Sequence, residues 1–182
     1  MSEPGRLEAP DLVLTRAPAP GLVVLRVRAD DPDSRAVAAT FLGAALPAGP
    51  ARPVLGPARD IFWTAPDAFL LDAGSAEAAS GLADGLRASL AGRHAACHPV
   101  GDARVRFEVA GDAAPGLLAR GTGIDLDTRV FAPGSAALTR FASLPVLLVR
   151  RDAAPVFALF ADRPLEAYLW DWLIDAAQGG PG

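Results

Sequence analysis

The sequence contains no lysine, and all 17 of its basic residues are arginine. This absence excludes a lysine Schiff base and the P-loop lysine that binds nucleotide phosphates, because both chemistries need an ε-amino group. The acidic residues outnumber the basic ones and give a formal net charge of −4. Nucleic-acid binding depends on clustered positive charge that displaces counterions from phosphates. We therefore expect no nucleic-acid partner.

Cysteine is almost absent as well. Cys97 is the only one, so no intrachain disulfide forms and a secreted disulfide scaffold is excluded. The first ten residues carry acids and prolines where a signal peptide needs a basic patch followed by an apolar run. No apolar run approaches the roughly 20 residues that a membrane-spanning helix requires. These absences predict a cytoplasmic protein that does not contact a membrane.

What the sequence does have is enough apolar material for a core. Hydrophobic residues make up 51% of the 182 residues and charged ones 21%, which is typical of a folded domain. The abundance of alanine, glycine, proline and arginine is typical of a GC-rich bacterial genome. We expect a flexible N-terminal arm or strap over residues 1–20, rich in proline, and a folded domain over residues 21–178. A short tail, residues 179–182, follows.

The folded domain divides into two predicted lobes of about residues 21–95 and 96–178. In the first, Asp31-Pro32 predicts the start of a helix that Pro47 ends, and Ser75 precedes a helix with a leucine edge. The elements expected in this lobe are a strand at 23–28, the helix after Asp31, a loop at 48–60, a hairpin of 61–63 with 69–71, and the helix over Leu82, Leu86 and Leu90.

The second lobe repeats a similar order. Its expected elements are a strand at 105–109, a short helix around 117–118 that ends at Gly121, strands at 137–141, 146–149 and 156–160, and an amphipathic helix at 164–177. Two strand-helix-strand lobes predict an α+β fold with largely antiparallel sheets.

His94, Cys97 and His98 form the first candidate site, because thiolate and imidazole are ligands of zinc. A zinc site needs three or four ligands, however, and no second cluster of histidine or cysteine completes this one. The same trio also suggests a nucleophile beside a base, but the sequence around Cys97 lacks the flanking glycines of a known cysteine nucleophile. A pair of loop histidines and a small buried thiol is the favoured interpretation.

Two further motifs lie close together. Gly121-Thr122-Gly123 suggests a phosphate loop, but these glycines follow a helix, so helix termination is favoured. Asp125, Asp127 and Arg129 occupy alternate positions, so their side chains point to the same side of the chain if the segment is extended. Paired carboxylates suit acid–base catalysis, yet a neighbouring arginine keeps both ionised. A structural or interfacial ion cluster is therefore favoured over an active site.

The second half of the chain carries a longer pattern. Gly121 to Gly134, followed by Ala137–Phe141 and Pro145–Val149, resembles the gamma subunit of heterotetrameric sarcosine oxidase. Phe62–Leu71 and Tyr168–Leu173 agree with that family in order and spacing, so the likeness covers most of residues 23–177. Residues 97–102 depart from it, because family members commonly carry an Asp-x-Ser-His-like stretch there.

The resemblance implies a fold like a shortened aminomethyltransferase (folate-binding) domain. It also implies a complex of alpha, beta, gamma and delta subunits that oxidatively demethylates sarcosine to glycine, passes the one-carbon unit to tetrahydrofolate and forms hydrogen peroxide. FAD, FMN, NAD, tetrahydrofolate and zinc would belong to the partner subunits. This chain would then carry no cofactor and no catalytic residue, as a structural subunit.

Two alternatives stay open. One is a stand-alone aminomethyltransferase-like folate-binding protein, in which Asp125 or Asp127 would contact the pterin ring. The other is a gamma-like subunit of a related complex that oxidises N-methylglutamate or another N-methyl amine. Sequence does not separate the substrates, because the substrate contacts would lie in another chain.

The possible subunit interface comprises two regions. The first is the segment from Asp125 to Phe131, which we expect to dock on the alpha subunit through Asp125, Asp127, Arg129 and an aromatic anchor, Phe131. The second is Trp170. Because residues two apart on a helix point in different directions, we expect Trp172 to face the core and Trp170 to lie on a flank.

Overall fold

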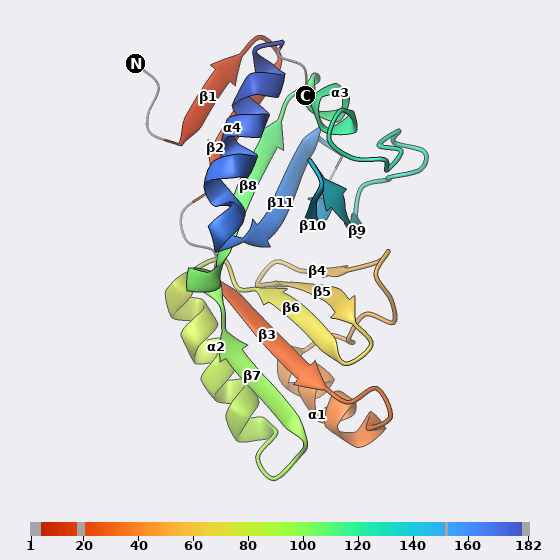
Figure 1. Cartoon of the computed structure of the whole chain (residues 1–182). Helices are drawn as coiled ribbons and strands as arrows, with labels where there is room; N and C mark the ends of the chain where they lie inside the picture. The colour runs from red at the N-terminus through yellow and green to blue at the C-terminus, as the bar shows by residue number, and fades with distance from the viewer. Residues whose placement is uncertain (1–4, 18–20, 152, 180–182) are drawn as a thin grey trace. The chain divides into compact units, whose positions relative to one another are not determined.

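The computed structural model describes residues 5–17, 21–151 and 153–179 (Figure 1). The chain forms two compact units. One comprises residues 19–102, and the other joins residues 1–18 to residues 103–182. No helix in the described ranges is long and apolar enough to cross a membrane.

The unit of residues 19–102 is a five-stranded antiparallel sheet with two helices. The strands lie in the order β4 (Val54–Leu55), β5 (Asp60–Ala65), β6 (Ala68–Asp72), β3 (Leu22–Val27) and β7 (Ala95–Pro99). Helices α1 (Pro32–Leu42) and α2 (Ala76–Ser89) pack on one face. Val23, Leu25 and Val27 alternate along β3 and all point into the core beneath these helices, as a period of two requires.

The helix starts in this unit follow their predicted capping residues. The Asp31 carboxylate accepts hydrogen bonds from the backbone N–H and the hydroxyl of Ser34, at 2.9 and 2.6 Å, and Pro32 occupies the first turn of α1. Ser75 caps α2 in the same way. The end of α1 differs from expectation. It ends at Gly43, which adopts the left-handed conformation with φ 67°, and not at Pro47, because glycine takes this conformation without strain.

Gly85 on α2 has a packing role, although glycine has a low helix propensity. A Cβ atom at this position would lie 2.3 Å from the tip of the Phe41 ring on α1, whereas one at Gly81 would meet nothing within 4 Å. Gly85 thus leaves the space in which the Phe41 ring sits against α2.

We expect the two glycines of α2 to respond to alanine in opposite ways. Gly81→Ala should raise the free energy of unfolding by about 0.5–1 kcal/mol, because alanine is the better helix former. Gly85→Ala should lower it by about 1–3 kcal/mol, because Phe41 must be displaced. Chemical denaturation of the full-length variants measures both. A higher free energy of unfolding in both variants would contradict this prediction, because it would show that a methyl group at residue 85 does not displace Phe41.

The other unit is a six-stranded antiparallel sheet. Its order is β1 (Arg6–Ala9), β2 (Leu12–Arg16), β8 (Arg104–Ala110), β11 (Val156–Asp162), β10 (Leu144–Arg150) and β9 (Ser135–Phe141). The helices α3 (Ala114–Ala119) and α4 (Glu166–Ala177) contribute to its core. Phe107, Phe141 and Phe157 are fully buried there together with Leu169 and Leu173 of α4, which lies across the sheet (Figure 1).

The N-terminal segment is not a flexible arm over its described part. Strands β1 and β2 form a hairpin, and β2 pairs with β8 with Leu14 opposite Val109. Leu12 and Leu14 are buried in the core, so the hydrophobic effect holds this segment in the sheet despite its prolines. Expectations for residues 1–4, 18–20 and 180–182 lie outside the described residues.

The predicted lobe boundary is also displaced. Residues 95–99 form β7 and pair with β3, so they belong to the first lobe, and the division falls between Asp102 and Ala103 and not near residue 95. The α+β class with antiparallel sheets is confirmed. The predicted loop of residues 48–60 contains a short strand, β4, which pairs with β5. The other predicted strands and helices lie within a few residues of their expected positions.

Candidate functional site

His94, Cys97 and His98 do not converge. Cys97 lies on β7 and is buried in the core beneath α1 and α2, whereas His98, one residue on, is exposed on the other face of the strand. Burial raises the pKa of the Cys97 thiol to about 11, so it stays protonated at neutral pH and is neither a zinc ligand nor a nucleophile. No group of three possible metal ligands occurs among the described residues.

Gly121 ends α3, as expected. Its N–H donates to the carbonyl oxygen of Leu118 at 3.0 Å. Its missing side chain leaves room for the ring of Phe141, since a Cβ atom there would lie 2.6 Å from the ring. The side-chain oxygen of Thr122 lies 3.2 Å from that of Thr139. Gly121 and Thr122 therefore serve the helix end and its packing.

The loop from Asp125 to Phe131 is a series of turns and not an extended segment. The Asp125 carboxylate accepts the N–H of Asp127 at 2.9 Å, and the Asp127 carboxylate accepts the N–H of Arg129 at 2.8 Å. The Arg129 guanidinium binds both Asp127 oxygens, at 2.9 and 2.8 Å. These bonds to the Arg129 side chain and then its backbone lower the pKa of Asp127. Asp127 is therefore held as an anion and is unsuited to general-acid catalysis.

Phe131 is not the exposed aromatic anchor that the sequence suggested. It is 5% exposed, and Leu126 at the other side of the loop is equally buried. Both side chains pack into the core of the unit and fix the loop at its two ends. The apolar side chain that this loop presents to solvent is Val130, which is 64% exposed.

The expected division between Trp172 in the core and Trp170 on an exposed flank is also wrong. Both tryptophans are half-buried. Trp172 meets the Phe141 ring edge-on at 4.7 Å between centroids, and Trp170 stacks on Phe107 at 5.9 Å. Because α4 lies on the sheet, both of its flanks contact the layer below, and only the outer part of Trp170 remains available to a partner.

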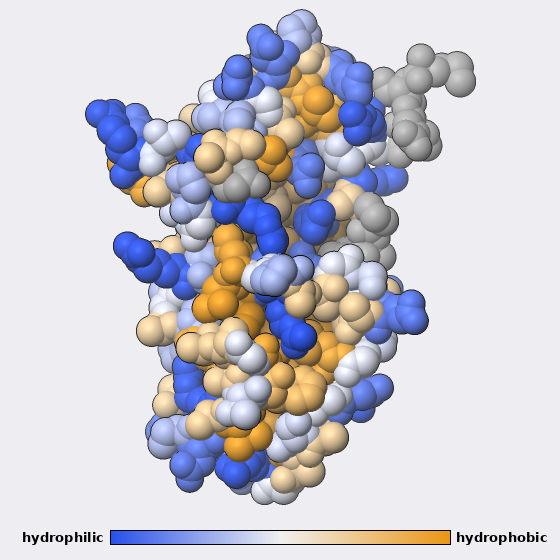
Figure 2. Space-filling model, turned by 180° about the vertical axis from the view of Figure 1, so that it is seen from behind, coloured by the Kyte–Doolittle hydropathy of each residue, from blue (hydrophilic) through white to orange (hydrophobic). Residues whose placement is uncertain are grey.

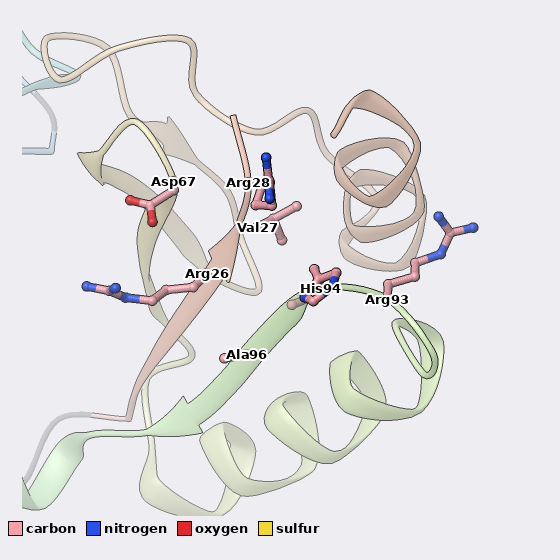
Figure 3. Close-up of a pocket in the computed structure, with 8 residues that line it drawn as sticks. Arg26, Val27, Arg28, Asp67, Arg93, His94 and Ala96 are labelled. Carbon is pink, nitrogen blue, oxygen red and sulfur yellow. The ribbon is translucent and has the colours of Figure 1, made fainter. Parts of the chain in front are cut away.

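A pocket that the sequence did not reveal lies in the unit of residues 19–102 (Figure 3). It encloses about 330 Å³ where β3 ends, β7 begins and the β5–β6 hairpin turns. Most of its lining is charged or polar, and the lining residues are Arg26, Val27, Arg28, Asp67, Arg93, His94, Ala95 and Ala96. Figure 3 shows Arg93 pointing away from the other side chains, toward α1, where its guanidinium lies 3.5 Å from the Ser34 hydroxyl.

Exposed hydrophobic side chains outside the pocket are the other surface features that a partner could contact. The face shown in Figure 2 is mixed, with groups of apolar residues between hydrophilic ones. Among the described residues, the large hydrophobic side chains with the greatest exposure are Phe41, Val130, Leu138 and Tyr168. The sequence gives no signal for their exposure, because each belongs to a run that also contains buried residues.

A model described as "Sarcosine oxidase, gamma subunit family" matches residues 26–179. A curated relative from Arthrobacter sp, named "Sarcosine oxidase subunit gamma", is 33% identical over 120 residues, which cover 64% of this chain and 55% of the relative. The alignment thus spans little more than half of that relative's length.

Two solved structures share the fold. A chain of the heterotetrameric sarcosine oxidase from Corynebacterium sp. U-96, in complex with pyrrole 2-carboxylate, superposes with a TM-score of 0.86 at 24% identity, over 99% of this chain and 91% of that one. Aminomethyltransferase T of the glycine cleavage system from Bartonella henselae gives 0.62 at 16% identity, over 88% of this chain and 45% of that one. The second likeness confirms the predicted aminomethyltransferase-like fold. Since the family model covers most of the sequence, the chain belongs to the sarcosine oxidase gamma subunit family.

Proposed function

We propose that this chain is a non-catalytic structural subunit of a cytoplasmic heterotetrameric sarcosine oxidase. The family match over residues 26–179 carries the proposal. The complex would demethylate sarcosine oxidatively to glycine, with tetrahydrofolate as acceptor of the one-carbon unit and hydrogen peroxide as the second product. Its partners would be alpha, beta and delta subunits.

The chemistry of the candidate residues supports a structural role. Cys97 is a buried thiol with its pKa raised to about 11, and Asp127 is held as an anion by Arg129. Neither state suits a nucleophile or a general acid at neutral pH. We assign FAD, FMN, NAD, tetrahydrofolate and zinc to the partner subunits.

The assignment is tested by comparing the purified chain with the coexpressed complex. The isolated chain should be colourless and release no hydrogen peroxide with sarcosine, whereas the complex should show flavin absorbance and sarcosine-dependent peroxide. Micromolar binding of tetrahydrofolate to the isolated chain, measured by calorimetry, would instead favour the stand-alone folate-binding alternative. A complex that turns over N-methylglutamate and not sarcosine would change the substrate and leave the structural role in place.

We further propose that the loop from Asp125 to Phe131 docks on the alpha subunit through Val130 and Arg129. Val130 is 64% exposed, and the Arg129 side chain 86%. The loop is held in one conformation by its turns and its two buried ends. A preorganised loop loses little conformational entropy on binding, and arginine is enriched at interface hot spots.

The docking role predicts that assembly and folding respond separately to variants of this loop. Val130→Asp and Arg129→Ala should reduce recovery of the complex severalfold, while the isolated variants melt within a few degrees of the wild type. The exposed pair of Asp127 and Arg129 contributes at most about 1 kcal/mol to folding. Normal assembly of both variants would leave this segment as an ordinary surface loop.

A further inference from the structure

Arg26 is an exposed cation that lines the pocket in the unit of residues 19–102. It lies on β3, between β6 and β7, and the residues directly opposite it on those two strands are Ala68 and Ala96. A methyl group accepts no hydrogen bond, so neither neighbour pairs with the guanidinium. Arg26 is exposed, and no carboxylate of the described residues forms an ion pair with it.

The other charged groups around the pocket are mostly committed elsewhere. Arg28 donates two hydrogen bonds to the Asp30 carboxylate, at 2.8 and 2.6 Å. Arg93 lies against the hydroxyl of Ser34. Asp67 is the one carboxylate among the lining residues. The guanidinium of Arg26 is therefore the cation of the pocket that is left to bind a ligand.

Two histidines of the same unit add possible donors near the pocket. His94 lines the pocket, and His98 lies opposite Val24 on β7, so that strand alternation places it on the same side of the sheet as Arg26. Both histidines are exposed. The chain as a whole carries a net charge of −4, so a pocket that offers the Arg26 guanidinium and the His94 imidazole is locally unusual. Its chemistry is that of a carboxylate receptor, since the guanidinium fork matches a carboxylate in both geometry and charge.

The shape of the pocket favours a protein side chain over a small molecule. Small-molecule sites are concave, mostly apolar and bury most of the ligand, whereas this pocket is open and four of its eight lining residues are charged (Figure 3). We propose that it receives an acidic side chain of a partner subunit, with Arg26 as the residue that recognises the carboxylate. This inference rests on the proposed function, because it needs a complex in which a partner approaches this unit.

The test uses the coexpressed complex with a tag on this chain. Arg26→Ala should weaken association with the partner subunits about tenfold or more, as expected when one member of an interfacial charge pair is truncated. Arg26→Lys should restore only part of the loss, because lysine keeps the charge without the two-pronged geometry. Arg52→Ala is the matched control, since Arg52 is exposed, carries the same charge and lies outside the pocket. All three isolated chains should melt close to the wild type.

Three outcomes decide between the possibilities. Failure of the wild-type chain to recover any partner would reject the proposed function itself. Recovery of partners at wild-type affinity by Arg26→Ala, or the same loss in Arg52→Ala, would overturn the assignment of Arg26. Stabilisation of the isolated wild-type chain by millimolar citrate, abolished in Arg26→Ala, would overturn it in favour of a small-molecule anion site.

Discussion

Gly111→Ala should unfold the six-stranded unit more readily than any conservative change at the surface. Gly111 has φ 112°, a backbone conformation that residues other than glycine rarely adopt. A Cβ atom there would lie 2.2 Å from the carbonyl oxygen of Asp11 in the turn between β1 and β2. That oxygen is backbone and cannot rotate away. We expect a loss on the order of 4 kcal/mol in the free energy of unfolding.

The size of this loss reflects how many segments meet at Gly111. Its N–H donates to the carbonyl oxygen of Pro155 at 3.0 Å, and the Asp11 oxygen accepts the N–H of Ala113. Displacing Asp11 would therefore disturb the N-terminal hairpin, the end of β8 and the start of α3 together.

Gly116→Ala is the matched control for this prediction. Gly116 lies within α3, is exposed, and a Cβ atom there would meet nothing within 4 Å. Alanine should therefore be neutral or stabilising by up to about 1 kcal/mol. The two variants are compared by urea denaturation of the full chain. Similar midpoints for Gly111→Ala and the wild type would mean that the close approach to Asp11 is not required.

Arg150→Met should produce the second large loss, about 2–4 kcal/mol in the free energy of unfolding. Arg150 is 3% exposed. Its guanidinium donates to the carbonyl oxygen of Phe131 at 3.1 Å and lies 5.5 Å from the centre of the Phe157 ring. Methionine fills much of the volume but leaves a buried carbonyl without its donor, which costs about 1–3 kcal/mol, and removes the cation–π contact.

Arg150→Met should also open the loop from Asp125 to Phe131. The peptide bond after Arg129 should become more sensitive to trypsin, because the bond from Arg150 holds the end of the loop against the sheet. Arg87→Met serves as the control, since Arg87 forms an exposed ion pair with Asp84 and such pairs contribute little. Unchanged stability together with unchanged cleavage after Arg129 would contradict the anchoring role of Arg150.

The elements that the sequence predicted well are those with local signals. Asp31-Pro32 and Ser75 are capping patterns that need no tertiary information, and the structure places α1 and α2 directly after them. The hairpin of β1 and β2 was missed although Leu12 and Leu14 alternate with Val13 and Thr15. The strand signal there is only five residues long, and the surrounding prolines favoured a flexible arm instead.

The candidate site was harder to predict, because its properties depend on neighbours that are distant in sequence. Whether Phe131 is exposed or buried is decided by the core that it enters, and the loop alone gives no indication of that core. Arg26 is significant only because the strand register places alanines on both sides of it. The residues opposite Arg26 come from strands that are distant in the sequence, so no local pattern around Arg26 indicates them.

The most direct test of the central claim is the stoichiometry of the assembly. The chain, carrying an affinity tag, is coexpressed with the alpha, beta and delta reading frames of the same genome, and the purified product is weighed by native mass spectrometry. Our account predicts one copy of each of four subunits, flavin in the complex, and sarcosine-dependent peroxide that is lost when this chain is omitted from the expression. Recovery of the tagged chain alone, from cells in which the other three subunits form a fully active enzyme without it, would contradict the account.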